Sequence, residues 1–243
     1  MTTMQAEIIE IAERFRGPPR SGNGGYTCGR IAKHLSGSIA VRLRAPPPLA
    51  TPLRLETTAD AATLFDGDKV IGQAKQVASL DLELPQAPTL EQAHAASSSY
   101  SGFKSHAFPG CFVCGPERRA HDGLRIYAGP LPGSAVIAAP WTPDASLADE
   151  SGAVRSEFLW AALDCPGAFA TTAKIGEAPA VLGELCASLV DDVNAGEECV
   201  VVGWPLETQG RKRFAGTAIF HADGRPIAYA RAIWIEIALS SWG

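Results

Sequence analysis

The chain has 243 residues, of which 46% are hydrophobic and 19% charged, and its formal net charge is −5. This composition is typical of a globular protein with a sizeable core, and the negative charge argues against a nucleic-acid partner. No stretch is long and apolar enough to span a membrane. The sequence therefore directs attention to small-molecule ligands.

The opening stretch, MTTMQAEIIEIAERF, is acidic and lacks the uninterrupted apolar run of a signal peptide. We therefore expect a cytoplasmic protein whose cysteines are reduced thiols. Basic residues cluster at several places in the sequence. We interpret most of them as solvated surface charges, and the alternative is a site for an anionic ligand such as a nucleotide or a phosphate tail. They are Arg16, Arg20, Arg30, Arg42, Arg44, Arg54, Arg211, Lys212 and Arg213.

The first block of the chain, residues 1–85, predicts one helix followed by strands. A glycine-rich turn leads into YTCGRIAKHL, read as a helix that Gly37 stops. Alternating apolar runs then predict strands at 38–45 and 52–59 and a hairpin over 63–80. In this hairpin the Asp66-Gly67 pair is the turn signal.

Residues 86–122 form a connector, with a Ser-rich stretch and a Cys-x2-Cys pair, that we expect to be exposed and partly irregular. The second block, 123–243, predicts two short strands over 123–129 and 134–141, then a helix over 154–173 that Pro166 kinks or ends. Four strands follow, with Asp223-Gly224 as a hairpin signal. They cover 180–193, 198–210, 211–220 and 225–239.

The two blocks read alike, each with a helix followed by antiparallel strands and an Asp-Gly hairpin at its end. Together with NGGYTCGRIA at the first helix, this order resembles the double hotdog fold of acyl-CoA thioesterases and related dehydratases. The resemblance implies an α+β protein of two tandem hotdog units, each a long central helix wrapped by an antiparallel sheet. The units would form a pseudo-dimer with ligand sites between them.

The Asn23-Gly24-Gly25 triplet stands where the first helix begins. Backbone N–H groups at a helix N-terminus are unpaired, and glycine lets a thioester carbonyl approach them closely. Such donors stabilise a developing oxyanion. Asn23 is a cap or a substrate ligand, and Tyr26 begins the helix proper and lies at the substrate. The alternative is an ordinary glycine-rich loop with an Asn cap.

In the hotdog thioesterases that this chain resembles, the acid lies nine residues after the first residue of the opening triplet. Counting nine from Asn23 reaches Ala32, which has no carboxylate, whereas counting nine from Arg155 reaches Asp164. The resemblance thus implies one composite site, with glycine donors from the first unit and Asp164 from the second, and one degenerate site. Asp164 is then the base or nucleophile, although an Asp before Cys165-Pro166 is also a good turn former.

Two neighbours in the second block compete for roles at the substrate. Glu157 is the other candidate carboxylate, although a Glu in the first turn of a helix is also favoured by the helix dipole. Ser156 is a candidate for positioning water or for capping the helix.

Cys111 and Cys114, with His106 and His121 nearby, raise the question of a metal site. Zinc takes about four such ligands, but the histidine spacings fit no zinc finger and a second cysteine pair is missing. We favour a turn with packed thiols, with metal binding and redox chemistry as alternatives, and read Cys165 as core. We therefore assign no metal and no cofactor beyond coenzyme A as part of the substrate.

These features predict hydrolysis of an acyl-CoA or related thioester at the site between the units. The alternative is a non-catalytic hotdog protein that binds an acyl or aromatic ligand. A hydratase is disfavoured because the chain has no Asp-x4-His motif. Association of the fused pair into a homo-oligomer stays open.

Overall fold

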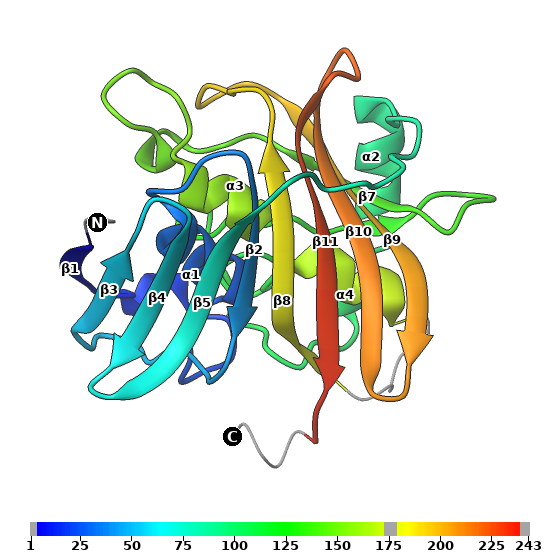
Figure 1. Ribbon diagram of the computed structural model, residues 1–243. Coiled ribbons are helices and arrows are strands. Elements are labelled where there is room, and N and C mark those ends of the chain that lie inside the picture. Colours follow the sequence, from blue (N-terminus) through cyan, green and yellow to red (C-terminus); the bar gives the residue numbers. More distant parts are fainter. Residues whose placement is uncertain (1–3, 173–178, 239–243) are drawn as a thin grey trace.

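The computed structural model describes residues 4–172 and 179–238. Within these ranges the strands form one antiparallel sheet in the order β1-β3-β4-β5-β2-β8-β11-β10-β9-β7-β6. The sheet curves around the helices α1, α3 and α4, which lie behind it in Figure 1. The first half of the chain spans β1 (Gln5–Ile9), η1 (Glu13–Phe15), α1 (Gly24–Ala32), β2 (Ser38–Leu43), β3 (Leu53–Thr57), β4 (Ala61–Asp66) and β5 (Lys69–Val77).

The later elements complete the other half of the sheet. They are α2 (Leu90–Ser97), η2 (Ser101–Phe103), β6 (Gly129–Pro130), β7 (Ile137–Trp141), η3 (Ala145–Leu147), α3 (Ser156–Ala162), α4 (Cys165–Thr171), β8 (Ala180–Leu189), β9 (Cys199–Gln209), β10 (Lys212–His221) and β11 (Pro226–Glu236). The two halves join where β2 pairs with β8, for example Val41 opposite Leu185. The predicted tandem α+β architecture is therefore confirmed.

The two hairpins predicted from the Asp-Gly pairs are present in the structure. Gly67 and Gly224 follow Asp66 and Asp223 and have positive φ angles of 57° and 87°, which glycine adopts without the steric cost that a side chain imposes. Strands in the first half of the sheet alternate buried and half-buried residues, as in Leu53–Thr57. The last residues of two predicted elements, 173 and 239, lie outside the described ranges.

The helices differ from the prediction in two places. α1 begins at Gly24 rather than at Tyr26, so both glycines lie inside its first turn rather than in a preceding loop. The helix predicted over 154–173 is two helices, because the chain leaves the helical conformation at Asp164 (φ −79°, ψ −84°). Pro166 fits the first turn of α4, where its missing N–H costs no hydrogen bond.

Two strand predictions were incomplete. Residues 123–128 are not a strand, and Arg125 there has a φ of 55°, which breaks an extended run. β1 was not predicted, because four of its five residues are exposed and show no alternation. It is an edge strand that pairs with β3.

The connector is partly irregular, as expected, but it is not exposed throughout. It contains α2, which begins with a capping box between Thr89 and Gln92. Further along, Phe112 and Val113 are both 0% exposed and Cys111 and Cys114 are both 3% exposed. This part of the connector belongs to the core, and it brings the Cys-x2-Cys pair next to α1 and α4.

Candidate functional site

The N-terminus of α1 is closed by Asn23, whose side chain makes two different hydrogen bonds. Its Oδ1 accepts from the N–H of Tyr26 at 2.9 Å, the usual N-cap bond. Its Nδ2 donates to Oδ2 of Asp164 at 2.6 Å. Asn23 therefore caps its own helix and fixes a carboxylate that comes from the other half of the chain.

Gly25 brings the two halves into contact at this point. Its N–H donates to Oδ2 of Asp164 at 3.1 Å. A Cβ at this position would lie 2.5 Å from the carbonyl oxygen of Trp160 and 2.6 Å from Cβ of Asp164. Only glycine allows this approach, and since its N–H is bonded to Asp164, Gly25 positions the carboxylate.

Gly24 is the first residue of α1, so its N–H has no partner within the helix. It lines the cavity described below, together with Asn23 and Asp164. A backbone donor therefore stands beside the carboxylate at the positive end of a helix.

Asp164 lies at the break between α3 and α4 and is 2% exposed. Its side chain makes no capping bond to α4 and bonds to α1 instead. Its backbone carbonyl accepts the N–H of Gly167 at 3.0 Å, so the turn between α3 and α4 is made by the backbone of Asp164. Burial raises the pKa of its carboxyl to about 7, against the opposing effect of the hydrogen bonds from Gly25 and Asn23. Its second oxygen, Oδ1, is buried and has no hydrogen-bond partner in the described part of the chain.

A cavity of about 320 Å³ opens beside these groups. It lies at the end of the sheet where β2 and β11 finish and β8 starts, the lower end in Figure 1. Most of its lining is apolar, and one of the tryptophans, Trp234, contributes to it. The other apolar lining includes Leu43, Pro46, Pro47, Phe108, Val181, Leu182, Ile235 and Ile237.

Three of the predicted substrate-binding residues lie outside the lining of this cavity. Tyr26 is 3% exposed, and its ring stacks on Phe15 at 4.2 Å between centroids. Ser156 and Glu157 open α3, and Glu157 is 7% exposed against Gly29 of α1. Of the four residues assigned to substrate binding, Asn23 alone reaches the cavity.

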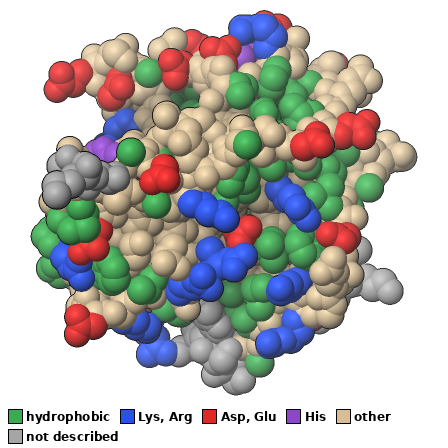
Figure 2. Space-filling view, in the orientation of Figure 1, with side chains coloured by type: hydrophobic (Ala, Val, Ile, Leu, Met, Phe, Trp, Pro, Cys, Tyr) green, Lys and Arg blue, Asp and Glu red, His purple; other side chains and the backbone are tan. Residues whose placement is uncertain are grey.

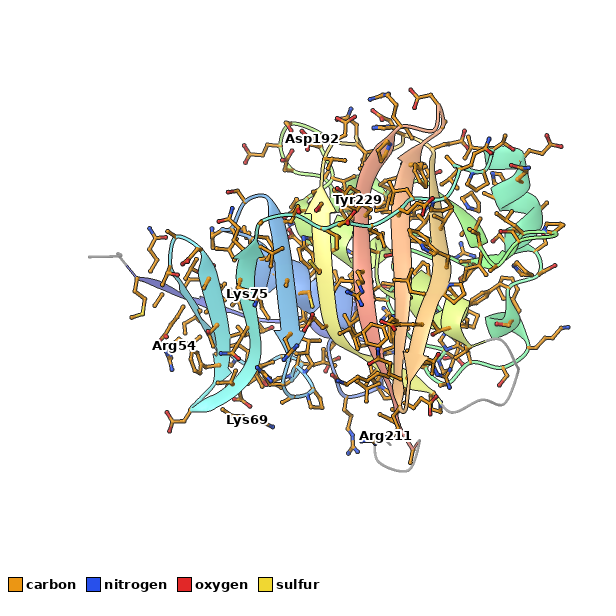
Figure 3. All side chains as sticks on the ribbon, turned by 45° about the vertical axis from the view of Figure 1, so that its right-hand side comes forward. Arg54, Lys69, Lys75, Asp192, Arg211 and Tyr229 are labelled. Atoms are coloured by element: carbon orange, nitrogen blue, oxygen red, sulfur yellow. The ribbon has the colours of Figure 1, made fainter. Side chains whose placement is uncertain are left out.

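The outer face of the sheet carries basic side chains over its centre (Figure 2). Several of them are paired, such as Arg42 with Glu184 and Arg231 with Glu207. Arg44 lines the cavity. Lys69 and Arg211 lie at the lower end of the strands, and Asp192 lies at the opposite end (Figure 3).

The Cys-x2-Cys pair meets a third thiol that sequence spacing did not identify. Cys165, the first residue of α4, places its Sγ 3.6 Å from that of Cys111, and the three Sγ atoms including Cys114 lie within 4.8 Å of one another. His106 joins them, with its Nε2 3.3 Å from Sγ of Cys114. His121 instead pairs with Asp144 at the surface.

The thiols of this cluster differ in acidity. Hydrogen bonds from Cys114 and Cys165 hold the pKa of the Cys111 thiol well below its ordinary value. Burial raises the pKa of Cys114, and the bond to Cys111 raises that of Cys165. A negative charge in the cluster is therefore best placed on Cys111.

No family model matches the sequence, and no curated protein does either. Solved structures are similar over nearly the whole chain. The tesB protein of Mycobacterium avium subs. paratuberculosis is 12% identical, with a TM-score of 0.64 over 96% of this chain and 93% of its own. The acyl-CoA thioesterase II TesB2 of Mycobacterium marinum is 10% identical, with a TM-score of 0.61 over 98% and 94%.

A third similar structure is a protein of unknown function with a hot dog fold from Alicyclobacillus acidocaldarius. It is 13% identical, with a TM-score of 0.60 over 96% of this chain and 94% of its own.

Among the helices that the structure describes, none has the length and hydropathy needed to cross a membrane. At these identities the similarity establishes the fold, and the fold of this chain is the double hotdog fold.

Proposed function

We propose that the chain hydrolyses an acyl thioester at the composite site between α1 and the α3–α4 break. One observation carries the proposal: Oδ2 of Asp164 is fixed by Asn23 and Gly25, Oδ1 has no hydrogen-bond partner among the described residues, and Asp164 lines the same cavity as Gly24. A buried carboxylate oriented through one oxygen keeps the other available for chemistry. The similarity to the acyl-CoA thioesterase II TesB2 of Mycobacterium marinum supports this reaction class.

In the proposed reaction, the thioester carbonyl lies at the N-terminus of α1. The N–H of Gly24 donates to the carbonyl oxygen and stabilises the negative charge that develops there. Asp164 takes a proton from a water molecule, and the water oxygen forms a bond to the carbonyl carbon. The carbon–sulfur bond then breaks, and the proton passes to the departing thiolate, leaving a carboxylic acid and a thiol.

The cavity favours an apolar acyl group of modest size. Its volume of about 320 Å³ is at the lower end of the range of about 300–1,000 Å³ for ligand pockets. Basic groups lie at the same end of the sheet, with Arg44 in the lining and Lys69 and Arg211 at neighbouring hairpins. This charge suits the phosphates of a coenzyme A carrier.

The test compares Asp164→Asn with Asp192→Asn, which changes an exposed loop carboxylate. Each protein is incubated with a panel of acyl-CoAs, including short aliphatic and aromatic acyl groups, and the free acid is measured by chromatography. Loss of a general base lowers the rate by about 100-fold or more. We expect this loss for Asp164→Asn, with a melting temperature at least equal to the wild type, and none for Asp192→Asn.

Two outcomes would contradict the proposal. Equal hydrolysis by Asp164→Asn and the wild type would remove Asp164 from the reaction. Saturable binding of acyl-CoAs by the wild type without release of acid would favour the non-catalytic alternative, in which the same cavity holds an acyl ligand that is not hydrolysed.

A further inference from the structure

A second group of reactive side chains lies next to Asp164 and has no part in the proposed hydrolysis. Cys111 and Cys114 come from the connector, and Cys165 comes from the first turn of α4. All three are at most 7% exposed. Their Sγ atoms lie within 4.8 Å of one another, and those of Cys111 and Cys165 are 3.6 Å apart.

The chain around Cys111 folds into a tight turn. The N–H of Gly115 donates to the carbonyl oxygen of Cys111 at 3.0 Å. A Cβ at Gly115 would lie 2.5 Å from that carbonyl oxygen. A turn of this kind presents two cysteines of one short segment to a common point.

Side-chain donors surround the same sulfurs. Nδ2 of Asn23 lies 3.9 Å from Sγ of Cys111 and 4.0 Å from Sγ of Cys165. His106 accepts the N–H of Phe108 on Nδ1 at 2.9 Å, so in the neutral ring Nε2 carries the proton and points it at Cys114. N–H donors around sulfur suit thiolates, which accept strong hydrogen bonds, better than neutral thiols.

Several thiolates cannot share one buried site unless a cation neutralises them. We propose that Cys111, Cys114 and Cys165 bind one thiophilic divalent cation of the zinc type. A zinc–sulfur distance of about 2.3 Å with tetrahedral geometry separates the sulfurs by roughly 3.8 Å. One pair already has this separation, and the rest need approach by about 1 Å at most.

Binding converts three thiols into thiolates and releases three protons, so the ion and its ligands carry a net charge of −1. The donors at Asn23 and His106 offset this charge. Three protein ligands leave one tetrahedral position for water, and Cys111 and Cys165 line the cavity from which water reaches it. The ion would fasten the connector to α4, a role separate from the hydrolysis proposed above.

The first experiment measures metal in the full-length protein purified in reductant without chelator. We expect about one zinc per chain in the wild type, loss of most of it in Cys114→Ser, and no loss in the matched control Cys186→Ser, since Cys186 lies on β8 outside the cluster. The same pattern is expected in an Asp164→Asn background, which keeps this result independent of hydrolysis.

The second experiment uses wild-type protein and so does not depend on how the variants fold. Metal-free, reduced protein is titrated with Co²⁺, and thiolate-to-cobalt charge-transfer absorption is recorded together with proton release. We expect saturation at about one equivalent and displacement of the band by Zn²⁺. Absence of both the absorption and bound zinc would overturn the proposal, and so would a Cys111–Cys165 disulfide in the metal-free protein from reducing cells, which would indicate a redox pair.

Discussion

At the N-terminus of α1, Asn23 caps the helix and holds a buried carboxylate from the other half of the chain. At the N-terminus of α3, Arg155 occupies the equivalent position and makes no side-chain cap; its guanidinium lies over the ring of Phe158 at 4.8 Å from the centroid. Ala32 stands where a second carboxylate would be. A helix N-terminus alone therefore does not make a site: glycine, a bifunctional cap and a partner acid must coincide.

The largest effect is expected from Ala32→Asp, which places a carboxylate on α1 at the position that corresponds to Asp164 after α3. Ala32 is 5% exposed. Arg155, which stands at the start of α3 as Asn23 does at the start of α1, already donates to the carbonyl oxygens of Leu147 and Ser146. A buried charge without a partner destabilises a protein by about 3–5 kcal/mol. Urea unfolding should show such a loss with no gain in hydrolysis. An unchanged free energy of unfolding, or a higher rate of hydrolysis, would show that the N-terminus of α3 can also form a site with a carboxylate from α1.

A smaller effect is expected from Gly25→Ala, with Gly29→Ala as its control. Both glycines pack α1 against α3, and a Cβ at Gly29 would lie 2.6 Å from Cα of Glu157. Overpacking of this kind costs about 1–3 kcal/mol of the free energy of unfolding in each variant. Only Gly25→Ala displaces Asp164, and displacement of this proposed base is expected to lower the rate by about 100-fold. Equal rates in the two variants would mean that Gly25 serves packing alone.

The smallest effect separates the two functions of Asn23. Asn23→Ala loses the cap, at about 1 kcal/mol of the free energy of unfolding, and the bond to Asp164. Asn23→Ser keeps a capping oxygen but is too short to reach Asp164, so it should recover most of the stability and not the rate. A charged hydrogen bond is worth about 1.5–3 kcal/mol, so rates of both variants should fall about tenfold or more. Full activity in Asn23→Ser would contradict the positioning role.

Local signals were enough to predict most of the fold. Asp-Gly pairs located the hairpins of β4–β5 and β10–β11, and alternation located most strands. The edge strand β1 was not predicted because four of its five residues are exposed and give no alternating pattern. The run 123–128 reads as a strand, but positive φ angles at His121 and Arg125 turn the backbone there.

The site could be predicted only in part. The nine-residue count from Arg155 led to Asp164, and the structure places that carboxylate on the glycine entry of α1. Contacts between distant segments could not be predicted from local sequence. Cys111 and Cys165, for example, are in contact although they are 54 residues apart in the chain. The side-chain direction of Tyr26, which faces an aromatic cluster and not the cavity, depends on packing that the helical period does not specify.

The buried part of the connector has one more consequence. Phe112 is enclosed by rings from both halves of the chain, Phe15 and Tyr26 from the first and Phe158 from the second. A symmetric pair of separate subunits would need two such inserts, whereas this chain has one and seats it beside the entry of α1. The segment that links the two halves is thus part of the interior, and because it is present once, it gives the two halves unequal surroundings.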